Sequence, residues 1–260
     1  MEVLRKGSRG DDVKRLQEIL GVTADSVFGE KTLEAVKAFQ REHNLFPDGI
    51  VGPKTWDMLL ADDGIDIVKA FINTHITYSQ VRQVKYIAIH YTAGATSKAG
   101  AAMNTRSVFI SRPASADFVV DDETIVQINP DISKYYCWAV GDKRNGYTGG
   151  GKYAGLASNK NTISIEICSN LRKGWSGLYP NHEGWYFTDE AINKAVELTK
   201  YLMKRYGIPK ENVIRHYDVT GKLCPGLLHW NDGILYDNNG KSLGKRNDST
   251  EWEAFKKRLV

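Results

Sequence analysis

Two histidines and a cysteine are the residues whose side chains could hold a metal ion together. His90 ends one apolar stretch, His216 directly follows another, and Cys224 comes shortly after His216. Two imidazole nitrogens and a thiolate suit zinc in tetrahedral geometry, whereas magnesium and calcium prefer oxygen ligands. Three protein ligands leave a fourth position for water, as in catalytic zinc sites. The spacing is not that of a zinc finger, so these side chains can meet only if the strands that carry them are neighbours.

Each of these residues also has an ordinary structural interpretation. A single histidine at the end of an apolar strand is more often a core residue with satisfied hydrogen bonds, and cysteine is among the most commonly buried residue types. The zinc hypothesis therefore depends on which other reactive side chains lie near His90, His216 and Cys224.

Glu166 is the first of these neighbours. In residues 163–168, Ile-Ser-Ile-Glu-Ile-Cys, the isoleucines alternate, so Glu166 and Cys168 fall on the opposite face of a strand. A carboxylate in so apolar a strand is costly to cover without a partner, so either that face is open to water or Glu166 has a charged partner. The same alternation allows His90 and Glu166 to share a pocket. A closed structural zinc site that includes Cys168 is the alternative.

Two further residues lie beside these candidate ligands. Lys222 stands two residues before Cys224 in a glycine-flanked loop, where a cation could stabilise an oxyanion on a substrate carbonyl, although a loop lysine is usually solvated. Asp218, two residues after His216, is a candidate acceptor for the N–H of a ligand imidazole.

The elements that must position these residues alternate between strands and helices beyond residue 65. A helix starts at a Thr188 cap and ends at Gly207, and a last helix carries apolar residues over 252–259. This order predicts an α/β fold in which α-helices pack on a mixed β-sheet. The polar, turn-rich segment 231–249 is expected to be an exposed excursion. The predicted strands are 84–90, 118–120, 125–128, 162–168 and 213–215, with 118–128 forming a hairpin.

The first sixty residues predict a small three-helix bundle. Asp11 can cap the first helix, the second stops near Asn44, and the third begins at Pro53. Residues 25–32 and 48–55 share the pattern D-x-x-(F/V)-G-x-K-T, which either marks a functional repeat or only two similar entries from loop to helix.

Residues 61–64 are the expected linker between two domains. The first domain spans 1–62 and the second spans 66–260. A unit of about sixty residues is small but can fold alone.

The composition excludes several classes of protein. The 260 residues are 42% hydrophobic and 25% charged, which is ordinary for a globular chain and excludes a mostly disordered one. A net charge of +4 does not call for nucleic acid, and the short basic run at 256–258 is more simply a solvated helix face. No apolar run is long enough for membrane insertion. Three cysteines form no disulfide framework, and no signal peptide is visible, so we expect synthesis in a cytoplasm.

The first domain resembles a known wall-binding family. The segments that carry the resemblance are LRKGSRGDDVKRLQEIL, FGEKTLEAVKAFQ and DGIVGPKTW, which together span nearly the whole family pattern over residues 2–61. They are similar to the peptidoglycan-binding module found beside many wall hydrolases. The resemblance implies a helical bundle that binds bacterial peptidoglycan.

The second domain resembles zinc-dependent N-acetylmuramoyl-L-alanine amidases of the phage-lysozyme type, whose fold is shared with peptidoglycan recognition proteins. Four blocks occur in the family order and span roughly 66–230, namely YIAIHYTAG, SADFVVDDETIVQINPD, NTISIEIC and VIRHYDVTGKLCPG. The resemblance implies hydrolysis, by a zinc-activated water, of the amide bond between the lactyl group of N-acetylmuramic acid and L-alanine. Such an endolysin or autolysin would reach the cell wall through a phage holin or by non-classical export.

The same resemblance assigns roles to five residues. One Zn²⁺ ion would be bound by His90, His216 and Cys224. Glu166 would be the general base, and Lys222 would assist the oxyanion.

This sequence departs from the family pattern at two positions. Ala116 stands where some members have a tyrosine or a nearby histidine, and Ala139 replaces the histidine of a W-H-A-G block. Ala116 cannot do the work of that tyrosine, which makes Glu166 more necessary. The alternative is a non-catalytic peptidoglycan-recognition protein of the same fold, and the presence of Cys224 with both histidines argues against it. A glycosidase would need a second carboxylate opposite Glu166, and none is evident.

Overall fold

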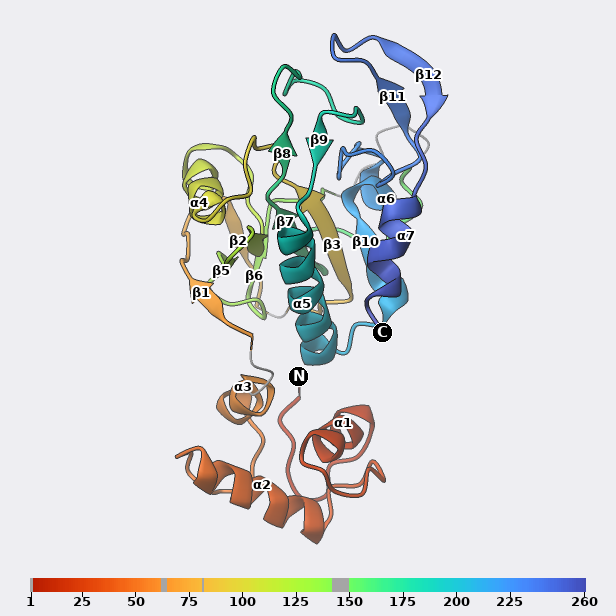
Figure 1. The fold of residues 1–260 in the computed structure, drawn as a ribbon. Coiled ribbons are helices and arrows are strands. Elements are labelled where there is room, and N and C mark those ends of the chain that lie inside the picture. The colour runs from red at the N-terminus through yellow and green to blue at the C-terminus, as the bar shows by residue number, and fades with distance from the viewer. Residues whose placement is uncertain (1, 62–64, 81, 142–149) are drawn as a thin grey trace. The chain divides into compact units, whose positions relative to one another are not determined.

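The computed structural model describes residues 2–61, 65–80, 82–141 and 150–260 (Figure 1). The chain divides into two compact units, Met1–Ile65 and Asp66–Val260. The linker expected at 61–64 lies outside the described residues from position 62 on, and Ala61 ends a helix. Within the described ranges, no helix combines the length and the apolar character that crossing a bilayer requires.

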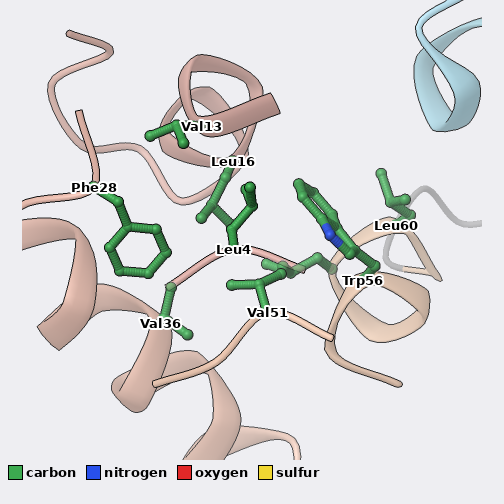
Figure 2. Packing of buried hydrophobic residues seen from close by; sticks show 9 residues of the cluster. Leu4, Val13, Leu16, Phe28, Val36, Val51, Trp56 and Leu60 are labelled. Atoms are coloured by element: carbon green, nitrogen blue, oxygen red, sulfur yellow. The ribbon is translucent and has the colours of Figure 1, made fainter. Parts of the chain in front are cut away.

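The first unit contains the expected three helices, α1 (Asp11–Ile19), α2 (Glu30–Glu42) and α3 (Pro53–Ala61). Their apolar faces enclose one core in which Leu16, Val36 and Trp56 are buried (Figure 2). The prediction that Asp11 caps α1 is wrong, because the cap residue is Gly10 and it makes no side-chain cap bond. Asp11 is instead the first helical residue, where its negative charge interacts favourably with the positive end of the helix dipole.

A buried glutamine organises the first copy of the repeated sequence pattern. The side-chain nitrogen of Gln17 donates to Asp25 Oδ1 at 2.8 Å, to the carbonyl of Val27 at 3.0 Å and to Thr32 Oγ1 at 3.0 Å. Gln17 is 1% exposed, so these bonds form away from water, where an unpaired amide would be costly.

The second copy repeats this arrangement atom for atom. Gln40 donates to Asp48 Oδ1 at 2.9 Å, to the carbonyl of Ile50 at 3.0 Å and to Thr55 Oγ1 at 3.2 Å. The repeated residues are therefore hydrogen-bonded within the unit, with the two threonines buried and the two aspartates exposed. Of the two interpretations of the pattern, the structure supports paired entries from loop to helix.

The second unit is built on a six-stranded mixed sheet with the order β1-β5-β4-β7-β3-β10. Strand β5 runs antiparallel to β4, which confirms the predicted hairpin, and the other neighbouring pairs are parallel. The first strand was not predicted from the sequence. The bounds are β1 Ile67–Lys69, β3 Tyr86–Tyr91, β4 Phe118–Val120, β5 Ile125–Gln127, β7 Thr162–Ile167 and β10 Val213–Arg215.

Helix α5 (Asp189–Tyr206) packs across the sheet and contacts β3, β4 and β7 (Figure 1). As predicted, Thr188 caps it by accepting the N–H of Ala191 at 3.2 Å. Gly207 ends the helix at φ 63°, a left-handed conformation that suits glycine. The short helix α6 (His216–Thr220) follows β10 directly, and α7 (Thr250–Lys257) is the last helix.

Helix α4 (Ala101–Ser111) was not predicted and covers the face of the sheet that carries Glu166. Val119 pairs in register with Glu166 and shares a core with Ala102 and Phe109 of this helix. Its buried side is marked only by alanines and one phenylalanine, so the apolar periodicity in the sequence is weak.

Three two-stranded sheets and a 3₁₀ turn complete the unit. The segment 231–249 contains the hairpin of β11 and β12, and the expectation of an exposed excursion holds only for part of it. Asn231 is fully buried and Asn247 is 7% exposed, so both ends are anchored in the unit. The bounds are β2 Ile76–Tyr78, β6 Tyr135–Cys137, β8 Asn170–Leu171, β9 Trp185–Tyr186, β11 Ile234–Tyr236, β12 Ser242–Arg246 and the 3₁₀ turn Lys210–Asn212.

A buried ion pair fixes the loops beneath the sheet. Arg82 Nη1 lies 3.1 Å from Asp117 Oδ1, and both side chains are fully buried. The remaining guanidinium donors bind backbone carbonyls, including those of Asn159 and Lys160. Asp117 also accepts the backbone N–H of Ser164 on β7 at 2.8 Å. Every buried charge of the pair is thus hydrogen-bonded, which a stable buried ion pair requires.

Candidate metal centre

The sheet brings the predicted ligands to the ends of neighbouring strands. His90 on β3 lies directly opposite Glu166 on β7 in the parallel register. On the other side of β3, Arg215 of β10 pairs with Ile89, so His216 follows immediately beside His90. Because the strands are parallel, their carboxyl ends meet at one edge, as the ligand hypothesis requires.

Three donor atoms converge there. Nδ1 of His216 lies 3.2 Å from Nδ1 of His90, and Sγ of Cys224 lies 3.7 Å from the same atom. Tetrahedral zinc with ordinary bond lengths separates two nitrogens by about 3.3 Å and a nitrogen from a sulfur by about 3.6 Å. All three side chains are buried. The donor set therefore fits a zinc ion in type and in spacing.

Burial keeps the two imidazoles neutral. It lowers the pKa of His90 well below its usual value, with the nearby His216 and Lys222 acting in the same direction. Burial, together with Lys222, lowers the pKa of His216 to about 3. Neutral rings keep a lone pair for a metal, and protonated rings do not.

The cysteine thiol has the opposite requirement. Burial, followed by the charge of Glu166, raises the pKa of Cys224 to about 12. A thiolate at this position therefore needs a strong positive charge close to it. A bound dication would lower the pKa of Cys224, because a metal ion deprotonates a thiol that coordinates it.

Glu166 lies beside the donor cluster without a full set of partners. Its Oε1 is 3.9 Å from Nδ1 of His90, and its side chain is 14% exposed. Its Oε2 is buried and has no hydrogen-bond partner among residues that the structure describes, and neither does Nε2 of His90. Burial raises the pKa of Glu166 to about 8, while Lys222 acts in the opposite direction. A buried carboxylate oxygen without a hydrogen-bond partner is unusual in a residue with a purely structural role.

A pocket of about 720 Å³ opens onto these residues. It is lined by the three donors and by Glu166 and Lys222. Helix α4 and the segment Trp138–Ala139 also line it. Lys222 is exposed, which is compatible with contact to a bound molecule. Three ligands with access to a pocket, beside a carboxylate, form the arrangement of a catalytic metal centre rather than a closed structural one.

The prediction for Asp218 is wrong. Its carboxylate accepts three hydrogen bonds from Arg215, through the backbone N–H at 2.8 Å, Nε at 2.9 Å and Nη2 at 2.6 Å. The imidazole of His216 instead forms a hydrogen bond with the backbone of Val140. The spacing of Arg215 and Asp218 across one helical turn was the signal in the sequence for this pairing.

Neither Cys168 nor Ala116 is among the residues that line the pocket. Both are buried against α4, and Sγ of Cys168 is 4.0 Å from Oγ1 of Thr105. Within the described part of the chain, the only group of potential metal ligands is His90, His216 and Cys224, which does not support a site built with Cys168. Ala139, by contrast, lines the pocket.

Comparison with known families agrees with this geometry. The profile of the N-acetylmuramoyl-L-alanine amidase family matches residues 80–227, and a profile described as a peptidoglycan binding domain matches residues 9–59. The first match covers more than half of the chain and contains all five predicted site residues. The chain therefore belongs to the N-acetylmuramoyl-L-alanine amidase family.

Individual relatives match parts of the chain. The amidase CwlL of Bacillus licheniformis is 30% identical over 172 residues, covering 62% of this chain and 42% of that protein. The amidase CwlH of Bacillus subtilis (strain 168) is 33% identical over 151 residues, covering 56% of this chain and 50% of that protein. The chain thus spans about half the length of these relatives. A solved structure of PlyL is 28% identical with a TM-score of 0.44, covering 62% of this chain and 87% of that one.

Proposed function

We propose that this protein is a zinc-dependent N-acetylmuramoyl-L-alanine amidase of the bacterial cell wall. It hydrolyses the amide bond between the lactyl group of N-acetylmuramic acid and L-alanine of the stem peptide. One observation carries the proposal, which is that three buried side chains place donor atoms at zinc-ligand spacing in a pocket, beside a carboxylate whose Oε2 has no partner among the described residues.

The chain's own residues would hold the metal and the substrate. Nδ1 of His90, Nδ1 of His216 and Sγ of Cys224 are the atoms that would bind zinc. Zinc bound there would act as a Lewis acid on the scissile carbonyl and on water.

Glu166 serves as the base in this proposal. One carboxylate oxygen accepts a proton from the attacking water, and the same group then delivers that proton to the departing amine of L-alanine. Its burial raises its pKa toward the working pH, which suits a group that must first accept a proton and then give it back. Lys222 stabilises the negative charge that develops on the lactyl carbonyl oxygen.

The first unit serves in attachment. Residues 9–59 match a peptidoglycan binding domain, which supports peptidoglycan as the polymer that this unit binds. A second attachment point raises the effective concentration of the catalytic unit at the wall without taking part in chemistry.

Product analysis tests the proposed reaction. Purified peptidoglycan digested with the zinc-loaded protein should gain new L-alanine amino termini and no new reducing sugars. New reducing sugars would indicate a glycosidase. Binding to the wall without any new termini would indicate the alternative, a recognition protein of the same fold.

A further inference from the structure

Asn159 holds a stretch of backbone beside the metal centre through a single side-chain oxygen. Its Oδ1 accepts three consecutive backbone N–H groups, from Ala139 at 3.0 Å, Val140 at 2.8 Å and Gly141 at 3.2 Å. One carboxamide oxygen thereby fixes the course of the loop where it passes the pocket. This loop carries the block in which the sequence departs from the family pattern.

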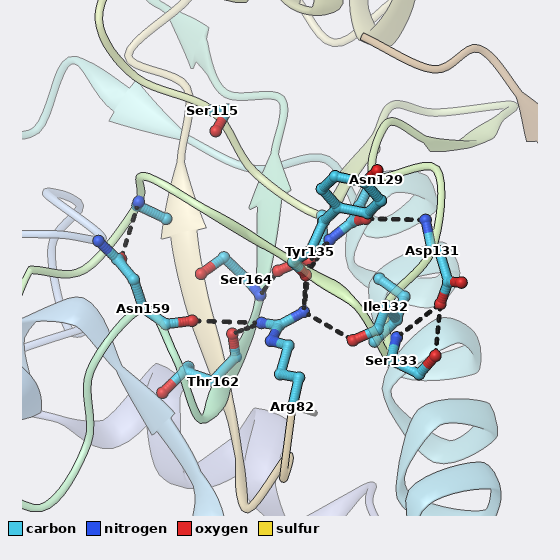
Figure 3. Close-up of polar contacts among 12 residues, drawn as sticks. Arg82, Ser115, Asn129, Asp131, Ile132, Ser133, Tyr135, Asn159, Thr162 and Ser164 are labelled. Carbon is cyan, nitrogen blue, oxygen red and sulfur yellow. Dashed lines mark hydrogen bonds and ion pairs between the residues drawn. The ribbon is translucent and has the colours of Figure 1, made fainter. Parts of the chain in front are cut away.

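The backbone at Asn159 and Lys160 is held by hydrogen bonds from Arg82. Arg82 donates through Nη2 to the carbonyl of Asn159 at 3.4 Å and through Nε to the carbonyl of Lys160 at 3.2 Å (Figure 3). Arg82 is also paired with the buried Asp117. The backbone of Asn159 and Lys160 is therefore connected through Arg82 to the core of the unit. The carboxamide is therefore held on a rigid support.

The loop that Asn159 holds reaches the metal ligands. Val140 packs in one core cluster with Ala88, two residues before His90 on its strand, and with Ile214, two residues before His216. Ala139 lines the same pocket as His216. The backbone of Val140 also forms a hydrogen bond with the imidazole of His216.

This hydrogen bond indicates which ring nitrogen of His216 carries the proton. Nδ1 of His216 faces the other donor atoms, 3.2 Å from Nδ1 of His90. A carbonyl acceptor at Val140 then leaves Nε2 as the nitrogen that donates. With the proton on Nε2, the lone pair stays on Nδ1, where a metal ion needs it.

We propose that Asn159 is a positioning residue for the metal centre, acting through the 139–141 backbone to fix the orientation and tautomer of His216. The inference rests on the proposed zinc site. Groups that orient a ligand imidazole in this way typically change metal affinity by about 10- to 100-fold when they are lost.

The chain offers a matched control two residues away. Asn161 is half-buried like Asn159, and its side chain also bonds to backbone, accepting from Ser158 at 2.8 Å and donating to Leu156 at 2.9 Å. These bonds close the same loop on itself and do not reach residues 139–141. Substitution of Asn161 therefore measures how much zinc affinity falls when hydrogen bonds within residues 156–161 are lost but the bond from Val140 to Asn159 is kept.

The test compares Asn159→Leu, Asn159→Asp and Asn161→Leu in the full chain. The readouts are zinc affinity by competition with a chelator, and the His216 tautomer of the metal-free protein by ¹⁵N NMR. Asn159→Leu should bind zinc about 10- to 100-fold more weakly and lose the single Nε2–H tautomer. Asn159→Asp keeps the acceptor oxygen and should stay within about threefold of the parent. If Asn159→Leu does not fold, Asn159→Ser replaces it, because its shorter hydroxyl cannot reach three amides.

Two outcomes would overturn the inference. One is parental zinc affinity and parental tautomer in the folded Asn159 variant, and the other is an equal loss of affinity in Asn161→Leu. A parent protein that binds no zinc would instead overturn the proposed function, so the two failures are distinguishable.

Discussion

Glu166 combines burial with a carboxylate oxygen, Oε2, that has no hydrogen-bond partner among the described residues, and it lies next to the carboxyl end of β7. Alternation along the strand turns it away from the isoleucines that pack under α5 and toward the pocket. The same alternation was visible in the sequence. What the sequence left open was whether that face met water or a charged partner, and the structure shows a side chain that is 14% exposed and lines a pocket beside His90.

At this scale we expect Glu166→Gln to separate metal binding from turnover. The amide has the same shape but cannot accept the proton, so kcat should fall by about 10²- to 10⁴-fold. Zinc content, measured by metal analysis, should stay at the parental level, because Glu166 is not one of the three donors. Ser164→Ala, on the same face of the same strand, is the control. Parental turnover in Glu166→Gln would end the assignment of this residue as base.

Zinc binding should release protons, and the pKa shifts of the three ligand residues indicate which group loses them. Both imidazoles are neutral at pH 7 because the pKa values of His90 and His216 are lowered, so they release none. The Cys224 thiol, whose pKa burial raises to about 12, must lose its proton to bind. Near pH 9, above the pKa of about 8 for Glu166, that thiol is the source.

We therefore expect at least one proton released per zinc near pH 9, the one that the thiol loses, with affinity rising as pH rises. Calorimetry in buffers of different ionisation enthalpy measures this number directly. Cys224→Ser should lose most of its zinc affinity. Zinc binding by the parent without proton release would contradict the ligand set.

At the scale of elements, two buried glutamines, Gln17 and Gln40, help to explain how short helices form a stable bundle. Each glutamine with its hydrogen-bond partners is called a glutamine hub. Each hub satisfies a loop that enters a helix, at positions where buried backbone groups would otherwise lack partners. The sequence pattern of these loops was recognised in advance. The glutamines that hold them, Gln17 and Gln40, lie outside the repeated motif and were missed.

Gln40→Leu should loosen the first unit. The change leaves the groups bonded by this side chain unsatisfied, including the N–H of Gly49, and should lower the local free energy of unfolding by about 2–3 kcal/mol. Hydrogen exchange of the amides in residues 48–56 is the measurement. Glu34→Leu, an exposed position on the same helix, should change exchange by less than about 0.5 kcal/mol. Equal protection in both variants would show that the hub contributes little.

At the scale of the whole molecule, the two units are expected to divide attachment from chemistry. A chain of residues 66–260 should keep its activity on soluble muropeptides and lose roughly tenfold or more on intact walls, because the second attachment is gone. Initial rates on the two substrates, compared with those of the full chain, measure the difference. A larger loss on the soluble fragments would contradict attachment as the role of the first unit.

The periodicity of the sequence predicted much of the fold. The three helices of the first unit, the hairpin and the capped α5 all followed from spacing and caps, which are local features. Helix α4 and strand β1 were missed because their apolar pattern is weak or short. The prediction for Asp218 failed because Arg215, three residues before it, donates to its carboxylate.

By itself, the sequence determined which residue types could bind a metal and which face of each strand they occupy. Side-chain alternation is a property of the chain over a few residues, so it can be read without coordinates. Only the tertiary structure decided that β3 lies between β7 and β10. That order brings His90 to Glu166 and to a histidine 126 residues away. Strand order depends on how the whole sheet packs, and so does the contact of the Asn159 loop with the site.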